Sequence, residues 1–215
     1  MILAHQKNPI AHLRKASAAA PLRVLISGCL AGQPCGIDGS DYGMGGCLDS
    51  LLAIDAIQTF TFCPEDFALG TPRTMPDIHG GDGFDVLAGG AQVLDENSSD
   101  LTAAMVRGAQ AMLVFAKENR IELAILTDMS GACGTQVISD GCRLVEDRKY
   151  QAGVGVAAAT LLQDGFHLVS QRDFRTLALI QTSLDPSFTA PLGLPDHHQS
   201  EWYQQAFPGG PSPRP

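Results

Sequence analysis

Residues 27–39 read S-G-C-L-A-G-Q-P-C-G-I-D-G, and this stretch decides the fold that we expect. It follows residues 22–26, an apolar and β-branched run that is typical of a buried strand. Cys29 therefore stands at the carboxyl end of a strand, where open α/β sheets bind their ligands. Glycines and a proline exclude regular structure, which leaves a loop whose amides can point at a bound group while Cys29 and Cys35 offer sulfur. We interpret the stretch as a site.

Strands and helices are predicted to alternate along the rest of the chain. Strands are expected at residues 22–26, 59–62, 121–126 and 166–169, and helices at residues 47–58, 101–119, 151–163 and 172–180. Residues 66–84 are expected to form an irregular loop, and residues 85–87 and 92–94 an edge hairpin around Gly89 and Gly90. The alternation predicts an α/β fold: a three-layer, Rossmann-like open sheet, mostly parallel, with helices on both faces.

Two further cysteines follow predicted strands. Cys63 begins C-P-E directly after residues 59–62, and Cys133 lies in T-D-M-S-G-A-C-G-T after residues 121–126. Because the carboxyl ends of parallel strands lie along one edge of a sheet, we expect Cys29, Cys63 and Cys133 to converge there. The fold, and not proximity in the sequence, would assemble this site.

Composition excludes several classes of partner. The net charge of −9, from 14 Lys and Arg against 23 Asp and Glu, argues against a nucleic-acid polymer and favours a small molecule. No apolar run is long enough to span a membrane, and residues 1–21 lack the apolar core of a secretory signal. We expect a cytoplasmic monomer or homodimer with a flexible N-terminal extension (1–21), one α/β domain (22–184) and a proline-rich C-terminal tail (185–215) with little core of its own.

The cysteine spacing leaves the kind of metal open. Iron–sulfur clusters and zinc both need thiolates, but the spacing here matches neither a C-x-x-C zinc knuckle nor a ferredoxin run. Cys47 and Cys142 are interpreted as small buried hydrophobes. No histidine is assigned chemistry, because those at the chain ends and in loops are more often satisfied than functional.

Several motifs, in order, resemble the thiouracil desulfurase family, bacterial proteins long catalogued as a domain of unknown function. They are S-G-C-L-A-G-Q-P-C-G-I-D-G from residue 27, C-P-E from 63, T-P-R from 71, G-D-G-F-D-V-L from 81 and M-S-G-A-C-G from 129. The similarity covers about residues 22–170. It implies a [4Fe-4S] cluster held by only Cys29, Cys63 and Cys133, with the fourth iron open.

An open metal position is the mark of a catalytic site, so the resemblance implies a cluster that acts as a Lewis acid and not as an electron carrier. The implied reaction replaces C=S by C=O on a thiolated pyrimidine, of thiouracil or thiouridine type, and releases sulfide. Sulfur is a soft ligand that suits iron.

The resemblance also suggests roles for side chains near the cysteines. Glu65 is the candidate base that activates water, and Ser130 would hydrogen-bond the substrate or the water. Asp38 is a weaker third candidate, and for Glu65 and Asp38 the alternative is a structural cap of loop amides. Arg73 would either pair a carboxylate or bind an anionic substrate. Cys35 is a rival ligand or a sulfur-relay thiol.

The chain departs from the family pattern at two places. Gly36–Ile37 stand where the family usually has Arg and Tyr, and Gly131–Ala132 where it usually has Pro and Ser. The reaction class is therefore expected to survive better than the preferred substrate. The alternative function is a non-catalytic metal module, either a zinc-stabilised domain or an iron–sulfur carrier, which a closed four-cysteine site with Cys35 would favour.

Overall fold

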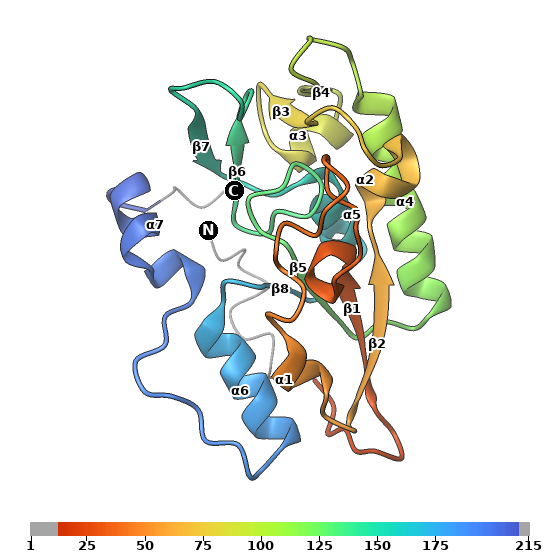
Figure 1. Ribbon diagram of the computed structural model, residues 1–215, viewed down its shortest axis with the longest axis vertical. Coiled ribbons are helices and arrows are strands. Elements are labelled where there is room, and N and C mark those ends of the chain that lie inside the picture. Colours follow the sequence, from red (N-terminus) through yellow and green to blue (C-terminus); the bar gives the residue numbers. More distant parts are fainter. Residues whose placement is uncertain (1–12, 211–215) are drawn as a thin grey trace.

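A four-stranded sheet runs through the centre of the computed structural model, which describes residues 13–210 (Figure 1). Its strands are β1 (Leu22–Ser27), β2 (Ile57–Phe62), β5 (Leu123–Leu126) and β8 (Leu168–Ser170). They lie in the order β2-β1-β5-β8, and each neighbouring pair is parallel. The predicted parallel α/β sheet is confirmed.

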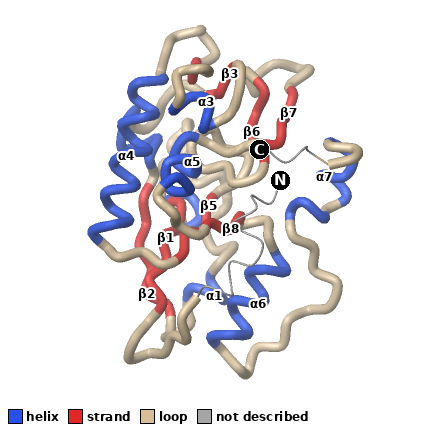
Figure 2. The backbone as a smooth tube through the Cα atoms, turned by 180° about the vertical axis from the view of Figure 1, so that it is seen from behind, coloured by secondary structure: helices blue, strands red, loops and turns tan. Residues whose placement is uncertain are grey.

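Helices cover both faces of this sheet (Figures 1 and 2). One face carries α4 (Thr102–Glu118) and α5 (Val156–Gln163), and the other α1 (Asp49–Leu52) and α6 (Phe174–Leu184). Side chains alternate along each strand, so Leu25 and Ala124 pack in the first layer while Val24 and Ile125 pack in the second. All four are fully buried, which accounts for the apolar runs in the sequence.

The topology fixes where a ligand should bind. From β1 the chain adds β2 on one side and then returns to add β5 on the other side of β1. The order therefore reverses between β1 and β5, and the carboxyl ends of strands at such a switch point leave a crevice. The loops that follow these two strands carry Cys29 and Cys133, so the fold places both at the expected site.

Two predicted helices are shorter than expected. The helix predicted over residues 47–58 ends at Leu52, because Ile57 already belongs to β2, where it pairs with Leu22 of β1. The helix predicted over residues 151–163 begins only at Val156, since its first two residues belong to strand β7 (Lys149–Ala152). This strand pairs antiparallel with β6 (Val137–Asp140). Strand pairing outweighs helical spacing in both segments.

The predicted hairpin around Gly89 and Gly90 is wrong. Its first arm is helix α3 (Gly83–Leu87), which Asp82 begins with a capping box. Its second arm, β4 (Gln92–Leu94), pairs with β3 (Asp77–His79), which lies in the segment predicted to be irregular. That segment also contains most of α2 (Pro64–Leu69).

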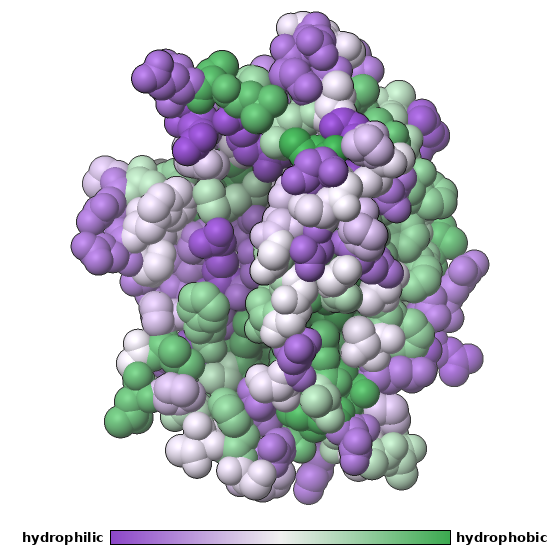
Figure 3. All heavy atoms as spheres, in the orientation of Figure 1, coloured by the Kyte–Doolittle hydropathy of each residue, from purple (hydrophilic) through white to green (hydrophobic). Residues whose placement is uncertain are grey.

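The described part of the N-terminal segment docks on the domain. Arg14 forms an ion pair with Glu122 at 2.6 Å, and Leu13 and Ala16 pack against the second core layer. The remainder of the predicted extension, residues 1–12, lies outside the described residues. Figure 3 shows hydrophilic and hydrophobic residues interspersed over the face that Figure 1 presents.

The C-terminal segment also packs, which corrects the expectation of a tail with little core. It contains η4 (His197–Gln199) and α7 (Glu201–Ala206), and the side chains of His197 and Tyr203 are buried. Helix α7 lies beside β7 (Figure 1), where the rings of Tyr150 and Trp202 meet edge to face. Residues 211–215 lie outside the described part, and within residues 13–210 no helix is long and apolar enough to cross a membrane.

Candidate active site

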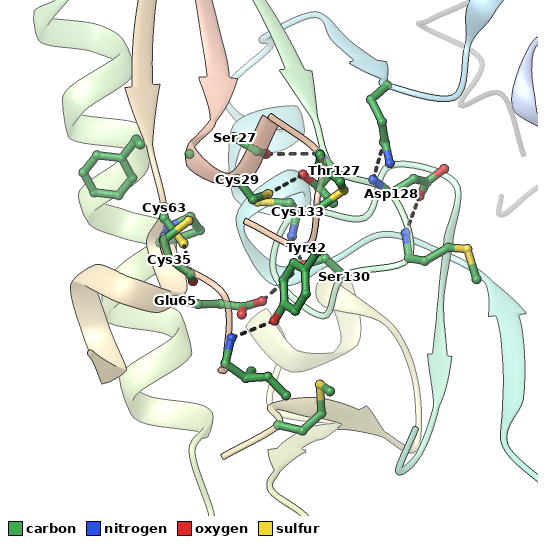
Figure 4. Close-up of a pocket in the computed structure, with 18 of the residues that line it drawn as sticks. Ser27, Cys29, Cys35, Tyr42, Cys63, Glu65, Thr127, Asp128, Ser130 and Cys133 are labelled. Carbon is green, nitrogen blue, oxygen red and sulfur yellow. Dashed lines mark hydrogen bonds between the residues drawn. The ribbon is translucent and has the colours of Figure 1, made fainter. Parts of the chain in front are cut away.

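A pocket of about 250 Å³ opens over the carboxyl ends of β1, β2 and β5 (Figure 4). Four of the six cysteines line it, namely Cys29, Cys35, Cys63 and Cys133. The predicted convergence of three cysteines from separate loops is thus what the structure shows, with Cys35 as a fourth thiol.

Cys29 lies in a short 3₁₀ turn, Gly28–Ala31, directly after β1. Its sulfur is 2.9 Å from the hydroxyl oxygen of Thr127, the residue that follows β5. A Cβ atom at Gly28 would lie 3.1 Å from the sulfur of Cys35 and 3.3 Å from the Cβ of Cys63. Because Gly28 has no side chain, Cys35 and Cys63 can lie close to the turn that carries Cys29.

Cys35 lines the pocket beside Cys63, whose thiol donates to the carbonyl oxygen of Cys35 at 3.9 Å, and the pKa values of Cys29, Cys35 and Cys63 depend on one another. The hydrogen bond from Cys35 is the main reason that the pKa of Cys29 falls to about 7, although burial opposes the charged form. The same contact lowers the pKa of Cys63, again against burial. The pKa of Cys35 is raised in turn by its bonds to both partners and by burial.

Cys63 is positioned by the start of helix α2. Its sulfur caps the helix by accepting a hydrogen bond from the amide of Asp66 at 3.4 Å. Helix α4 crosses close behind, where Gly108 faces the carbonyl oxygen of Pro64 with no room for a side chain. The close backbone contact between Gly108 of α4 and Pro64 therefore holds the turn that carries Cys63 and Glu65.

Cys133 belongs to the loop between β5 and β6, and its side chain is buried. Ser130 shapes this loop, because its hydroxyl oxygen accepts hydrogen bonds from the amides of Ala132 at 3.2 Å and Cys133 at 3.1 Å. Burial raises the pKa of the Cys133 thiol well above its usual value. A metal that binds this sulfur must therefore displace a firmly held proton.

The donor set fits a cluster better than a single ion. Within residues 13–210, no group of three or more His, Cys, Asp or Glu side chains could hold one metal ion. A zinc site needs its ligands to converge on one point, whereas the irons of a cluster occupy separate corners and their thiolates stand apart. Thiols on different walls of one pocket match the second arrangement, and soft sulfur donors suit iron–sulfur clusters.

Glu65 reaches from α2 toward Ser130 (Figure 4). One of its carboxylate oxygens accepts a hydrogen bond from the Ser130 hydroxyl at 3.1 Å, and the other accepts from Arg73 at 2.7 Å. Arg73 is only 5% exposed and also donates to the carbonyl oxygen of Cys35 at 2.9 Å. The structure thus answers the open question about Arg73: it pairs a carboxylate, that of Glu65.

Asp38 is the one predicted site residue that the structure does not bring to the pocket. It is exposed, and its carboxylate accepts hydrogen bonds from the amide and the hydroxyl of Ser40. This is the capping role weighed as the alternative, so a catalytic role for Asp38 stays a prediction without geometric support. Cys47 and Cys142 also lie away from the pocket lining, and Cys47 is exposed, which corrects its interpretation as a buried hydrophobe.

Tyr42, Thr127 and Asp128 are among the pocket residues that sequence reasoning did not single out. The hydroxyl of Tyr42 accepts a hydrogen bond from the amide of Ile37 at 2.7 Å. Tyr42 lies in a glycine-rich segment that gave no periodic signal. Thr127 and Asp128 follow β5 directly, so the strand-end argument that selected Cys133 could have found them.

Asp128 organises the whole β5–β6 loop. One carboxylate oxygen accepts hydrogen bonds from four backbone amides, those of Met129, Thr135, Gln136 and Val137. The other is 2.6 Å from Nδ1 of His197. Burial alone would raise the pKa of Asp128, but the contact with His197 and the loop amides outweigh burial and lower it.

Next to Asp128 the backbone is strained. Met129 lines the pocket with φ at +61°, a left-handed conformation that costs a residue other than glycine about 1–3 kcal/mol. Its amide nitrogen is held by the carbonyl oxygen of Val137 at 3.0 Å, and its own carbonyl oxygen accepts from Arg143 at 2.9 Å. Such strain persists only where the surroundings over-determine it, as they do here.

Two known proteins are similar to most of this chain. YbbK of Bacillus subtilis (strain 168), an uncharacterized protein, is 32% identical over 155 residues, which cover 72% of this chain and 99% of that protein. A solved structure of the [4Fe-4S]-dependent thiouracil desulfidase TudS is 32% identical and has a TM-score of 0.60. The match covers 74% of this chain and 96% of that structure.

The family comparison agrees with the motifs and with the pocket. The model of the 2-thiouracil desulfurase family matches residues 24–173, which include most of β1, all of β2, β5 and β8, and all four pocket cysteines. The resemblance that the motifs indicated is confirmed. The chain belongs to the 2-thiouracil desulfurase family.

Proposed function

We propose that this chain is a [4Fe-4S]-dependent desulfidase, which converts the C=S group of a thiouracil-type substrate to C=O and releases sulfide. The family and the similarity to TudS support the reaction. The observation that carries the proposal is the pocket itself, in which thiols from three strand ends face one space beside a partly buried carboxylate.

We assign the cluster to Cys29, Cys63 and Cys133, which come from the loops after β1, β2 and β5. When bound, a cluster with three protein ligands supplies a Lewis-acidic iron with affinity for the soft sulfur of a thiocarbonyl. Cys35 then remains a free thiol in the same pocket as the ligands. A pocket of about 250 Å³ has space for small groups, which is in keeping with a small-molecule substrate.

Glu65 is the proposed general base. Water must lose a proton as it attacks the carbon of the C=S group, and sulfide leaves as the new C=O group forms. The carboxylate of Glu65 is 12% exposed and lines the pocket, so water from the pocket can reach its free lone pairs. Arg73 holds the carboxylate in place and keeps a positive charge beside it.

Ser130 links the base to the third ligand. Its hydroxyl donates to Glu65, and its oxygen accepts from the amide of Cys133. When substrate or water occupies the pocket, the same hydroxyl can donate its hydrogen bond to the substrate or the water instead. We propose that Ser130 thereby holds the attacking water and the base at a fixed position relative to the loop of Cys133.

The wider predictions stay open beyond this reaction. The preference for free base, nucleoside or nucleotide, the monomeric or homodimeric state, the cytoplasmic location and the absence of a nucleic-acid partner remain predictions. The rival function, a non-catalytic zinc module or iron–sulfur carrier, gains its only support from the fourth thiol, Cys35, which lines the same pocket.

Anaerobic reconstitution with iron and sulfide, followed by incubation with 2-thiouracil, tests the proposal. We expect about four irons per chain, broad charge-transfer absorbance, and sulfide and uracil in equal amounts over many turnovers. The matched controls are Cys133→Ala, which should give no turnover, and Cys47→Ala, which should behave as the unchanged protein. Full cluster loading without turnover on thiolated bases, nucleosides or nucleotides would favour the carrier, and bound zinc without iron would favour the zinc module.

A further inference from the structure

The C-terminal segment reaches the active-site loop through one buried contact. His197 of η4 is 69 residues from Asp128 in the chain, yet its Nδ1 is 2.6 Å from the Asp128 carboxylate. The two side chains are 3% and 0% exposed. An interaction between polar groups this deeply buried is not weakened by competing water.

The contact bears on the loop that carries proposed site residues. The other carboxylate oxygen of Asp128 gathers the amides of Thr135, Gln136 and Val137 at 3.0 to 3.1 Å. These bonds close the loop in which Ser130 and Cys133 stand. The position of the Asp128 carboxylate therefore determines the shape of the loop.

The segment around His197 is fixed on several sides. Both the amide and the hydroxyl of Thr176 donate to the carboxylate of Asp196, at 2.8 and 2.9 Å. The amide of His197 donates to Asp173, which also accepts two hydrogen bonds from the side chain of Gln136. The segment thus contacts the β5–β6 loop by two routes, one through Asp128 and one through Asp173.

Aromatic rings enclose the imidazole of His197. The ring of Trp202 is stacked on it with centroids 5.7 Å apart, and the ring of Tyr203 meets it edge to face at 5.5 Å. The Nε2 atom is buried and has no hydrogen-bond partner within residues 13–210. The polar contact of the ring is therefore made at Nδ1, on the side of Asp128.

His197 lies outside both the pocket and the family match, which ends at residue 173. It does not line the pocket, so an effect of its imidazole on the reaction must pass through the contact with Asp128, whereas its backbone amide contacts Asp173. The carboxylate belongs to the shared part of the chain, and its buried partner comes from the segment beyond it.

We propose that His197 is a positioning residue of this enzyme. By donating from Nδ1 to Asp128, it fixes the carboxylate that closes the β5–β6 loop, and so holds Ser130 and Cys133 in their working arrangement. The catalytic part of this inference rests on the proposed function, whereas the structural part concerns the loop alone.

Four full-length proteins test it: the unchanged chain, His197→Phe, His197→Asn and the control His198→Phe. Phenylalanine keeps a ring against Trp202 and removes the donor, whereas asparagine keeps a donor near Nδ1 and removes the ring. If His197→Phe does not fold, His197→Ala replaces it with the same expectation. Hydrogen exchange at the amides of Thr135–Val137 is measured in each protein, together with kcat and KM for sulfide release from 2-thiouracil, per bound cluster.

We expect faster exchange at the three amides in His197→Phe, and a kcat reduced roughly 10-fold or more, since small displacements at a reacting centre have effects of this size. KM should change far less, because the pocket residues that come from outside the β5–β6 loop are unchanged. His197→Asn should restore both exchange and kcat most of the way, and His198→Phe should match the unchanged chain.

The inference is overturned if a folded variant without the donor exchanges and turns over like the unchanged chain, or if His197→Asn is as impaired as His197→Phe. A loss confined to KM would also overturn it. If the unchanged chain releases no sulfide, the proposed function fails, and hydrogen exchange alone still decides whether His197 holds the loop.

Discussion

Two walls of the pocket are unlike. The first, residues 28–46 after β1, is built from turns, and much of it is exposed, including Asp38 and Tyr42. The second, residues 127–139 after β5, is buried without interruption from residue 131 to residue 139. Both contribute cysteines to the same space, Cys29 and Cys35 from the first wall and Cys133 from the second.

The difference indicates that the two walls have different roles, because their shapes are held by different kinds of contact. In the first wall, carboxylates such as Asp38 and Asp41 cap nearby loop amides, so its shape depends on local contacts that water can replace. In the second wall, Asp128 joins the loop to His197, far along the chain, in a setting that excludes water. We infer that the first wall admits the substrate and that the second holds the reacting groups still.

The largest expected effect is common to both walls. Replacing Cys29 or Cys133 by Ala should abolish cluster loading, because a cluster with two protein ligands is not retained. Cys35→Ala should keep full loading, since we assign it no ligand role. Iron content after anaerobic reconstitution is the measurement, with Cys47→Ala as the control, and full loading of Cys133→Ala would refute the ligand assignment.

The next largest effect separates the walls. Asp128→Ala should lower the free energy of unfolding by about 3 kcal/mol or more, because several buried amides lose their acceptor at about 1–3 kcal/mol each. Asp38→Ala, on the exposed wall, should change stability little. Urea unfolding of the two cluster-free proteins measures both, and equal stabilities would contradict the contrast between the walls.

Glu65→Gln should slow the reaction without removing the cluster. An amide cannot accept the proton of the attacking water, so kcat should fall on the order of 10²-fold, which corresponds to about 2.7 kcal/mol in the activation barrier. The hydrogen bonds to Arg73 and Ser130 can be partly kept by the amide, which limits structural side effects. A rate equal to that of the unchanged chain, at equal iron content, would remove Glu65 from the mechanism.

Tyr42→Phe should have the smallest effect. It removes the hydroxyl that accepts from the amide of Ile37, at a residue that is 49% exposed. Water can replace that acceptor, so kcat/KM should change by roughly threefold or less. A loss as large as that of Glu65→Gln would show that an exposed contact in the first wall matters as much to the reaction as the proposed base.

The central part of the fold could be predicted from sequence because its signals are local. β1 and β5 are short apolar runs and β2 alternates threonine with phenylalanine, and the geometry of a parallel sheet brings Cys29, Cys63 and Cys133 together without further information. The hairpin around Gly89 and Gly90 was mispredicted because a three-residue arm has too few positions to separate a strand from the capped turn of α3.

The second wall could not be predicted in full. Its loop is closed by Asp128, and the buried partner of that carboxylate, His197, is 69 residues away in a proline-rich segment. A single pair of polar residues at such a separation leaves no periodic pattern, and a segment rich in proline is typical of a tail without a core. Only the folded chain shows that this segment packs behind the active site.

The most direct test of the account is a crystal structure of the protein reconstituted and grown without oxygen, with iron located by its anomalous signal. We expect four irons in the pocket, bound through Cys29, Cys63 and Cys133, with the sulfur of Cys35 unbound and one iron free of protein ligands. A cluster closed by Cys35 as a fourth ligand, or iron bound outside this pocket, would contradict the account.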